Sequence, residues 1–507
     1  MVFSSLMFLY IFLPVVLILY FISPMKIKNL IIFVSGILFY AWGEPICVLI
    51  MLLSTVIDYT AGIFMHKFDD NQKKRTICLI VSVAMNIGFL ALFKYSDFII
   101  DSMNAIFNLE ILNPVVRLNR FINSIFDLGL NEERVDLPIG ISFFTFQSMS
   151  YTIDLYRRNI KVQKSFINFS SYVSLFPQIV AGPIVRYEDV QKEIDTRKIN
   201  VNMAADGIAV FIKGLSKKVL LANNIGILWT NIKAMDYNEI SVVTAWLGIL
   251  AFTFQIYFDF SGYSDMAVGL GKILGFNFPQ NFDHPYMSKS ISEFWRRWHM
   301  TLGSWFKSYV YISLGGNRKG LPRTLINLII VWALTGLWHG SSWNFVIWGL
   351  YFGVIIIIER IGFGKILEKL PSFVSTLYTF ILVVFGWVLF DTTDLPSCFG
   401  YFKAMFGGNG VFIDNDAKYF IITNILIFAL CIPMIGLDAA KKIVNTVGFD
   451  AFLERMEVGT GFEDIDGIGG EKSNSILQWY ANESNQRVLE HLLQVVHVQK
   501  VEKQDTE

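Results

Sequence analysis

Long apolar runs alternate with short polar segments over most of this chain. A transmembrane helix needs about 20 largely apolar residues, because the hydrocarbon core of a bilayer is about 30 Å thick. Runs near this length predict helices at residues 5–22, 28–43, 46–66, 76–95, 137–155, 167–183, 203–222, 240–260, 323–340, 341–360, 371–390 and 417–437. The pattern predicts an all-α polytopic membrane protein, with about 11 transmembrane helices around a central passage. The runs at 137–155 and 167–183 are candidates for re-entrant or tilted helices.

Two segments depart from the pattern. Residues 284–322 are rich in Trp, Tyr, Arg and Gly and contain no clean apolar run of spanning length. A helix there would be amphipathic, so it would lie in the membrane interface or enter the membrane part-way. Residues 109–135 mix polar and apolar positions and are a second candidate for the interface.

The basic loops predict an orientation. Lys26 and Lys28 follow the first apolar run, the next turn has no basic residue, and Lys73, Lys74 and Arg75 follow the third run. Lys and Arg are enriched in cytoplasmic loops. We therefore expect an extracytoplasmic N-terminus and a cytoplasmic loop at residues 73–75.

The composition supports the membrane class. The 507 residues are 54% hydrophobic and only 17% charged, with a mean hydropathy of +0.49, whereas soluble domains carry about 25% charged residues. The four cysteines are far apart and form no Cys-x-x-Cys pair, so we expect neither a metal site nor a redox pair.

The charge is unevenly distributed. From Gly448 onward there are 5 Lys or Arg against 12 Asp or Glu, a net charge of −7, and the rest of the chain carries +7. This shift predicts a membrane domain at residues 1–437 and an acidic, soluble tail at residues 438–507.

Two histidines occur in a tryptophan-rich stretch of the apolar chain. His299 ends the run Phe-Trp-Arg-Arg-Trp-His, and His339 lies in Gly-Leu-Trp-His-Gly. A titratable side chain at membrane depth indicates a functional site, and histidine can accept and return a proton near neutral pH. In a helix, His299 would lie one turn from Trp295. The alternative is structural: tryptophans anchor helices at the interface, and a buried histidine can serve packing alone.

His339 is the stronger candidate, because Gly336 and Gly340 beside it allow other groups to approach closely. A core histidine bonded to a neighbouring helix is the alternative. Arg323 and His339 are separated by roughly 24 Å on a straight helix. We therefore expect the two histidines near opposite ends of one passage rather than in contact.

Several sequence blocks together resemble the membrane-bound O-acyltransferases, in particular their bacterial alginate O-acetylation branch. The blocks are Leu-Pro-Ile-Gly-Ile-Ser-Phe-Phe-Thr-Phe-Gln at 137–147, Phe-Pro-Gln-Ile-Val-Ala-Gly-Pro-Ile-Val-Arg at 176–186, Tyr-Phe-Asp-Phe-Ser-Gly-Tyr-Ser-Asp at 257–265, Asn-Phe-Asp-His-Pro-Tyr at 281–286, Trp-Arg-Arg-Trp-His-Met-Thr-Leu at 295–302, Gly-Gly-Asn-Arg-Lys-Gly at 315–320 and Gly-Leu-Trp-His-Gly at 336–340. Each block alone is weak, but all of them in this order are specific.

The resemblance implies O-acyl transfer in the inner membrane of a bacterial cell. It implies that His339 is the essential catalytic histidine and that His299 supports it or the passage of the acyl group. A histidine that removes a hydroxyl proton during attack on a thioester supplies about 10²–10⁴-fold of rate. The pocket residues expected from the matching blocks are Trp295, Trp298, Trp338, Asp259 and Asn281.

The expected acyl donor is acetyl-CoA, with no resident cofactor. Arg186, Lys217 and Lys218 are candidates to bind its phosphates at the cytoplasmic face, although positive-inside anchoring explains them equally well. For Asp259, Asp265 and Asp283 we favour structural hydrogen bonding to the backbone.

The expected partners are an exported polysaccharide such as alginate, membrane lipid and a periplasmic or extracellular acetyltransferase. D-alanyl transfer and peptidoglycan O-acylation are alternatives within the family. Alternatives from other classes are a proton-coupled transporter, although no internal repeat is present, and a structural subunit of an export complex.

The tail departs from the family. Residues 462–472 and 475–482 resemble a helix-hairpin-helix segment of NAD-dependent DNA ligases. DNA binding depends on basic charge against phosphates, and this tail is acidic. We therefore expect no nucleic-acid binding and no function for the tail.

Overall fold

The computed structural model describes residues 2–43, 45, 47–126, 129, 131–135, 138, 140–180, 182–392, 394–431, 449–461 and 464. Within these residues the chain is helical and contains no strand. Internal contacts divide it into two units, Met1–Ile422 and Thr423–Glu507. The boundary expected after residue 437 falls within 432–448, outside the described residues.

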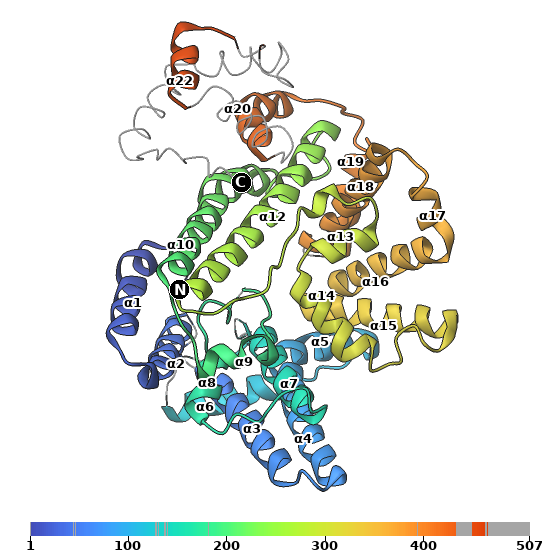
Figure 1. Ribbon diagram of the computed structural model, residues 1–507. Coiled ribbons are helices and arrows are strands. Elements are labelled where there is room, and N and C mark those ends of the chain that lie inside the picture. The colour runs from blue at the N-terminus through green and yellow to red at the C-terminus, as the bar shows by residue number, and fades with distance from the viewer. Residues whose placement is uncertain are drawn as a thin grey trace. The chain divides into compact units, whose positions relative to one another are not determined.

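The helices of the first unit are distributed over its whole length. In chain order they are α1 (Leu13–Ile22), α2 (Met25–Ala41), α3 (Cys47–Lys67), α4 (Gln72–Leu90), α5 (Ser96–Phe107), α6 (Pro114–Phe126), α7 (Ile141–Tyr156), α8 (Phe166–Val173), α9 (Tyr187–Asp195), α10 (Val201–Ser216), α11 (Asn223–Lys233), α12 (Val242–Ile273), α13 (Ile291–Arg297), α14 (Met300–Phe306), α15 (Gly320–His339), α16 (Trp343–Ile358), α17 (Gly364–Leu367), α18 (Ser372–Asp391), α19 (Leu395–Met405) and α20 (Asn415–Cys431), which extends past the unit boundary (Figure 1). Short π-helical turns are η1 (Phe8–Phe12), η2 (Ala91–Tyr95), η3 (Lys217–Ala222), η5 (Lys307–Tyr311) and η6 (Glu359–Phe363), and η4 (Pro285–Met287) is a 3-10 turn.

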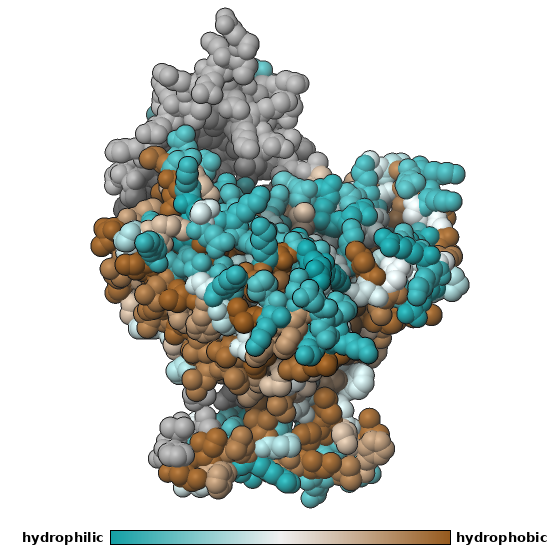
Figure 2. Space-filling model, turned by 60° about the horizontal axis from the view of Figure 1, so that its bottom comes forward, coloured by the Kyte–Doolittle hydropathy of each residue, from teal (hydrophilic) through white to brown (hydrophobic). Residues whose placement is uncertain are grey.

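Several described helices are long and apolar enough to cross a membrane. They are Cys47–Lys67, Gln72–Phe107, Val242–Ile273, Gly320–His339, Trp343–Leu367 and Ser372–Asp391, and Phe8–Ile22 is a shorter apolar helix. Large apolar side chains such as Ile22 and Leu49 are 74% and 67% exposed, which suits contact with lipid. Figure 2 shows hydrophilic residues over the middle and upper right of one face, with hydrophobic residues on its left side and below them. The all-α polytopic prediction is confirmed, while the expected count of about 11 spans stays a prediction.

The two re-entrant candidates differ from spanning helices. Helix α7 is buried on nearly all sides, as is typical of a helix inside a protein rather than at its lipid face. Helix α8 has only 8 residues, so it is about 12 Å long and cannot cross a bilayer. The chain after α8 is irregular and buried, with Phe176 and Ile179 fully covered. Enclosure by protein is what non-helical backbone in a membrane domain requires.

Helices α10 and α12 pack with their backbones in close contact. A Cβ atom at Gly214 would lie 2.4 Å from the carbonyl oxygen of Gly262, and one at Gly269 would lie 2.5 Å from that of Gly207. Small residues at such positions allow membrane helices to approach closely. This contact fixes α12, whose residues Ile256 and Phe260 line the cavity described below.

Between residues 284 and 319, all of which are described, no helix is long enough to span a membrane, in line with the prediction for 284–322, whose last three residues begin α15. Helices α13 and α14 have 7 residues each, and Figure 1 shows them between α12 and the pair α15–α16. The N-terminus of α13 is held by the buried Glu359 carboxylate, which accepts hydrogen bonds from the backbone N–H groups of Ile291 at 2.7 Å and Ser292 at 2.9 Å. Carboxylates are favourable at this end of a helix.

In the second unit, helix α22 (Phe449–Val458) is described. The Arg455 guanidinium donates to both carboxylate oxygens of Asp464, at 2.6 and 2.9 Å. Apart from Asp464, the segments that resemble a ligase helix-hairpin-helix lie outside the described residues.

Candidate active site

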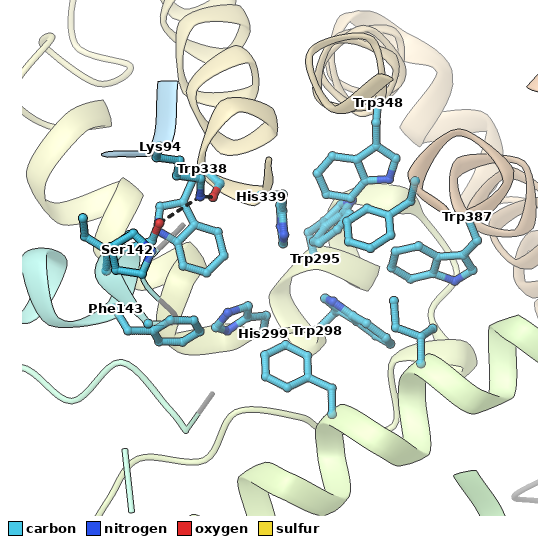
Figure 3. Close-up of a pocket in the computed structure, with 16 residues that line it drawn as sticks. Lys94, Ser142, Phe143, Trp295, Trp298, His299, Trp338, His339, Trp348 and Trp387 are labelled. Carbon is cyan, nitrogen blue, oxygen red and sulfur yellow. Dashed lines mark hydrogen bonds between the residues drawn. The ribbon is translucent and has the colours of Figure 1, made fainter. Parts of the chain in front are cut away.

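His339 is the last residue of α15 and projects into a cavity (Figure 3). Its ring makes edge contacts with Trp338, Trp348 and Phe390, with centroid distances of 5.0, 4.9 and 5.3 Å. Its Nε2 atom is buried and has no hydrogen-bond partner among the described residues. This nitrogen is therefore available to a bound group.

The glycines beside His339 are required by the packing of α15 on α16. A Cβ at Gly336 would lie 2.2 Å from the carbonyl oxygen of Phe345, and one at Gly340 would lie 2.1 Å from the Phe345 ring. No other residue type fits without displacing this turn. The turn therefore holds His339 at the cavity wall.

His299 is not inside a helix, although from the sequence we considered a helix that placed it one turn from Trp295. It is the N-cap of α14 and has left-handed backbone angles, φ 45° and ψ 52°. This conformation is unusual for a residue other than glycine. The break between α13 and α14 turns the imidazole inward, where it is only 2% exposed.

Asn281 determines which nitrogen of His299 carries the proton. The Asn281 Oδ1 atom accepts from the backbone N–H of Thr301 at 3.2 Å and lies 3.1 Å from His299 Nδ1. Because this oxygen can only accept, Nδ1 of His299 is the donor. Nε2 of a neutral His299 then carries a lone pair, and it has no partner among the described residues.

Both histidines line one cavity of about 420 Å³. The Trp338 ring contacts both imidazoles, with centroid distances of 5.8 Å to His299 and 5.0 Å to His339. The prediction that they lie near opposite ends of a passage is therefore wrong. The chain leads from His299 through α14 and η5, reverses direction, and comes back through α15. The start of α14, at His299, therefore lies beside the end of α15, at His339.

The same cavity contains a lysine that the sequence reasoning did not consider. Lys94 is 8% exposed, and its ammonium group donates to Ser142 Oγ at 2.8 Å and to the carbonyl oxygen of Trp338 (Figure 3). Tyr95 donates to the next carbonyl, that of Leu337, at 2.8 Å. These two side chains bind the carbonyl end of α15, where a cation is favourable. The sequence did contain a sign of this residue's importance, because Lys94 is a charged residue within the apolar run 76–95.

A second cavity, of about 930 Å³, adjoins the first, and the two share Trp295, Trp298 and His299. Its wall includes four basic residues, Lys289, Arg296, Lys307 and Arg360, and three acidic ones, Glu293, Glu359 and Glu368. Burial raises the pKa of Glu293 on the same wall, but hydrogen bonds from the Lys289 backbone and from Arg297 outweigh it and hold this pKa below its usual value. Glu293 is thus charged and already bound.

The three residues expected to bind the phosphates of the acyl donor lie outside both cavities. Arg186 is paired with Glu188 and with Asp189 at 3.2 Å, Lys217 with Asp265 at 2.7 Å, and Lys218 with Asp259. Asp259 and Asp265 thus pair with lysines, instead of the backbone bonds we favoured. Of the expected pocket residues, Trp295, Trp298 and Trp338 line the first cavity, Asn281 supports His299, and Asp259 contributes to neither.

Comparison with known proteins agrees with this arrangement. The profile of the MBOAT, membrane-bound O-acyltransferase family, matches residues 31–389. A probable alginate O-acetylase of Pseudomonas aeruginosa is 39% identical over 406 residues, 80% of this chain and 75% of that protein. The peptidoglycan O-acetyltransferase of Helicobacter pylori is 32% identical over 82% of each chain. The teichoic acid D-alanyltransferase of Bacillus subtilis is 28% identical over 50% of this chain and 68% of that protein.

The chain therefore belongs to the membrane-bound O-acyltransferase family. It is a multi-pass membrane enzyme that catalyses O-acyl transfer. The resemblance inferred from the sequence blocks is confirmed, and the transporter and structural-subunit alternatives are set aside.

Proposed function

We propose that the enzyme transfers an acetyl group from cytoplasmic acetyl-CoA to a hydroxyl acceptor on the opposite side of the membrane, for O-acetylation of an exported polysaccharide such as alginate. The observation that carries the proposal is the cavity lined by His299, His339 and Lys94, with a second cavity beside it whose wall includes basic residues. The O-acetylase relatives match more of this chain, and at higher identity, than the D-alanyltransferase.

His339 acts as the general base in this proposal. Its Nε2 takes the proton of the acceptor hydroxyl while the hydroxyl oxygen bonds to the thioester carbonyl carbon. Collapse of the tetrahedral oxyanion then breaks the carbon–sulfur bond, and His339 returns the proton to the departing thiolate. The products are the acetyl ester and the free thiol.

Lys94 stabilises the oxyanion. An ammonium group has three N–H donors, and the described contacts use two of them, to Ser142 and to the Trp338 carbonyl. The third is available to a bound oxygen. A fixed donor in a largely apolar cavity is effective, because removing one such donor typically lowers kcat by about 10²–10³-fold.

The second cavity receives the donor. Its basic residues Lys289, Arg296, Lys307 and Arg360 complement the phosphates of coenzyme A. Its wall extends to Tyr311, Leu370 and Ser372 at helix ends away from His339, and it meets the first cavity at His299. Arg186, Lys217 and Lys218 have no part in this route, because carboxylates already pair with them.

The distribution of basic residues supports an extracytoplasmic N-terminus and a cytoplasmic loop at residues 73–75. The bacterial relatives support insertion in a bacterial inner membrane. On the far side, a periplasmic or extracellular acetyltransferase accepts the acetyl group for the glycan.

The function is tested with purified enzyme, acetyl-CoA labelled in the acetyl group and a soluble hydroxyl acceptor such as an alginate oligosaccharide, with and without the partner acetyltransferase. We expect time-dependent loss of label from acetyl-CoA that wild type catalyses and His339→Ala does not. Equal loss with both proteins would contradict the proposed donor and base.

A further inference from the structure

A cavity of about 310 Å³ lies far from the histidines in the chain, where the end of α1, the start of α2 and the first turn of α10 meet. Its lining residues are Phe21, Lys28, Arg197, Ile199, Asn200, Val201 and Ala204. The lining contains two cations and no acidic residue. The reaction described above uses none of these groups.

Arg197 is a buried cation, and one of its guanidinium nitrogens has no hydrogen-bond partner in the part of the chain that the structure describes. It is 9% exposed; its Nε donates to Tyr20 Oη at 2.6 Å and its Nη1 to Asn29 Oδ1 at 2.7 Å and to the Glu193 carbonyl oxygen at 3.1 Å. Its Nη2 is buried and has no partner among the described residues. A buried guanidinium normally has a carboxylate or phosphate partner.

Lys28 adds a second positive charge at the same place. Its Nζ lies 4.2 Å from the centroid of the Tyr20 ring, and the Arg197 guanidinium carbon lies 5.5 Å from that centroid. No ion pair joins either cation to a carboxylate in the described part of the chain. Both cations lie over the same tyrosine ring, so an anion bound between them would offset their mutual repulsion.

The first turn of α10 contributes to the same wall. This helix has 16 residues, and the Asn200 side chain accepts from the Met203 N–H at 2.6 Å. The N–H groups of the first two residues have no acceptor within their own helix. Such a helix end attracts anions, phosphate in particular.

The surroundings point to a lipid as the source of the anion. Apolar side chains beside the cavity are strongly exposed: Val201 is 84%, Ile22 74% and Phe21 47% exposed. Ile208 and Ile212 continue along α10 and are 50% and 55% exposed, so acyl chains can lie along this surface. Basic pockets between membrane helices commonly bind anionic lipid headgroups.

We propose that Lys28, Arg197 and the first turn of α10 form a binding site for a phosphate group, supplied by the headgroup of an anionic membrane lipid. The bound lipid joins α1, α2 and α10 at one edge of the membrane domain. The proposal goes beyond acyl transfer and does not depend on it.

The test uses the purified full-length enzyme in detergent and measures the shift of its thermal unfolding midpoint. The probes are phosphatidylglycerol, the zwitterionic phosphatidylcholine and inorganic phosphate at matched ionic strength. Lys28→Ala removes one cation of the site, and Val201→Glu places a carboxylate at its exposed rim, where an acidic residue is compatible with a helix start. Lys26→Ala is the matched control, because Lys26 is on the same helix but does not line the cavity.

We expect phosphatidylglycerol to stabilise wild type and Lys26→Ala equally, and phosphatidylcholine to have little effect. Lys28→Ala should bind phosphatidylglycerol about fivefold more weakly, the factor typical of one basic residue at an anionic surface, and Val201→Glu more weakly still. A Lys28-dependent shift with inorganic phosphate as large as that with phosphatidylglycerol would support the phosphate site but assign it to a free anion. An unchanged response to phosphatidylglycerol in both Lys28→Ala and Val201→Glu would overturn the proposal.

Discussion

Replacing Lys94 with methionine separates the charge of this residue from its packing. Methionine has a similar unbranched shape and fills irregular space, so Lys94→Met keeps the volume while it removes the ammonium group. It leaves Ser142 Oγ and the Trp338 carbonyl without this donor. Each loss destabilises the fold by about 1–3 kcal/mol. The buried ammonium group of the wild type carries a desolvation cost of several kcal/mol, which the substitution removes. The two effects oppose each other, so the net change in stability should be small.

The effect on catalysis should be much larger. If Lys94 stabilises the oxyanion, its loss lowers kcat by about 10²–10³-fold, or about 2.7–4 kcal/mol in the barrier, with little change in KM. The assay is acetyl transfer by purified protein whose unfolding midpoint is measured in parallel. Ser142→Ala is the control, because it removes one partner of the ammonium but keeps the charge; a loss below about tenfold is expected. A folded Lys94→Met variant with a kcat within about threefold of wild type would refute the role.

Three further predictions concern the support of the site, the topology and the tail. Asn281→Leu removes the acceptor for His299 Nδ1, so transfer should fall about tenfold, the effect of one buried hydrogen bond; unchanged kinetics would show that the His299 tautomer is irrelevant. A cysteine at residue 71 should resist an impermeant thiol reagent in intact cells, because that loop is expected in the cytoplasm; labelling there would reverse the orientation. Truncation after Val447 should preserve membrane insertion, and the isolated tail should not bind duplex DNA at physiological salt; micromolar binding would contradict the charge argument.

The apolar pattern predicted most of the helices, since lipid imposes a simple rule of length and composition. It failed where a segment is apolar because it is buried in protein. Helix α8 is too short to span and continues as enclosed irregular chain, and α7 is covered on nearly all sides. Run length alone cannot distinguish burial in lipid from burial in protein.

The sequence also identified both histidines but not their proximity. Spacing along α15 gives a distance within one helix, whereas the contact between His299, Trp338 and His339 depends on the reversal between η5 and α15. Lys94 was missed because a charge near the end of a run resembles interfacial anchoring. The ion pairs of Lys217 and Lys218 with α12 join residues more than 40 positions apart, so sequence alone gave no sign that these lysines were already paired.

His339 is the residue on which the account depends most, and its replacement by alanine gives the most direct measurement. The variant should be produced in cells that export the glycan, with the amount of protein in the membrane and the O-acetyl content of the glycan measured together. We predict a wild-type amount of folded protein and loss of glycan O-acetylation, because the variant lacks the group that takes the acceptor proton in the proposed reaction. Normal acetylation by a well-expressed His339→Ala variant would contradict the account.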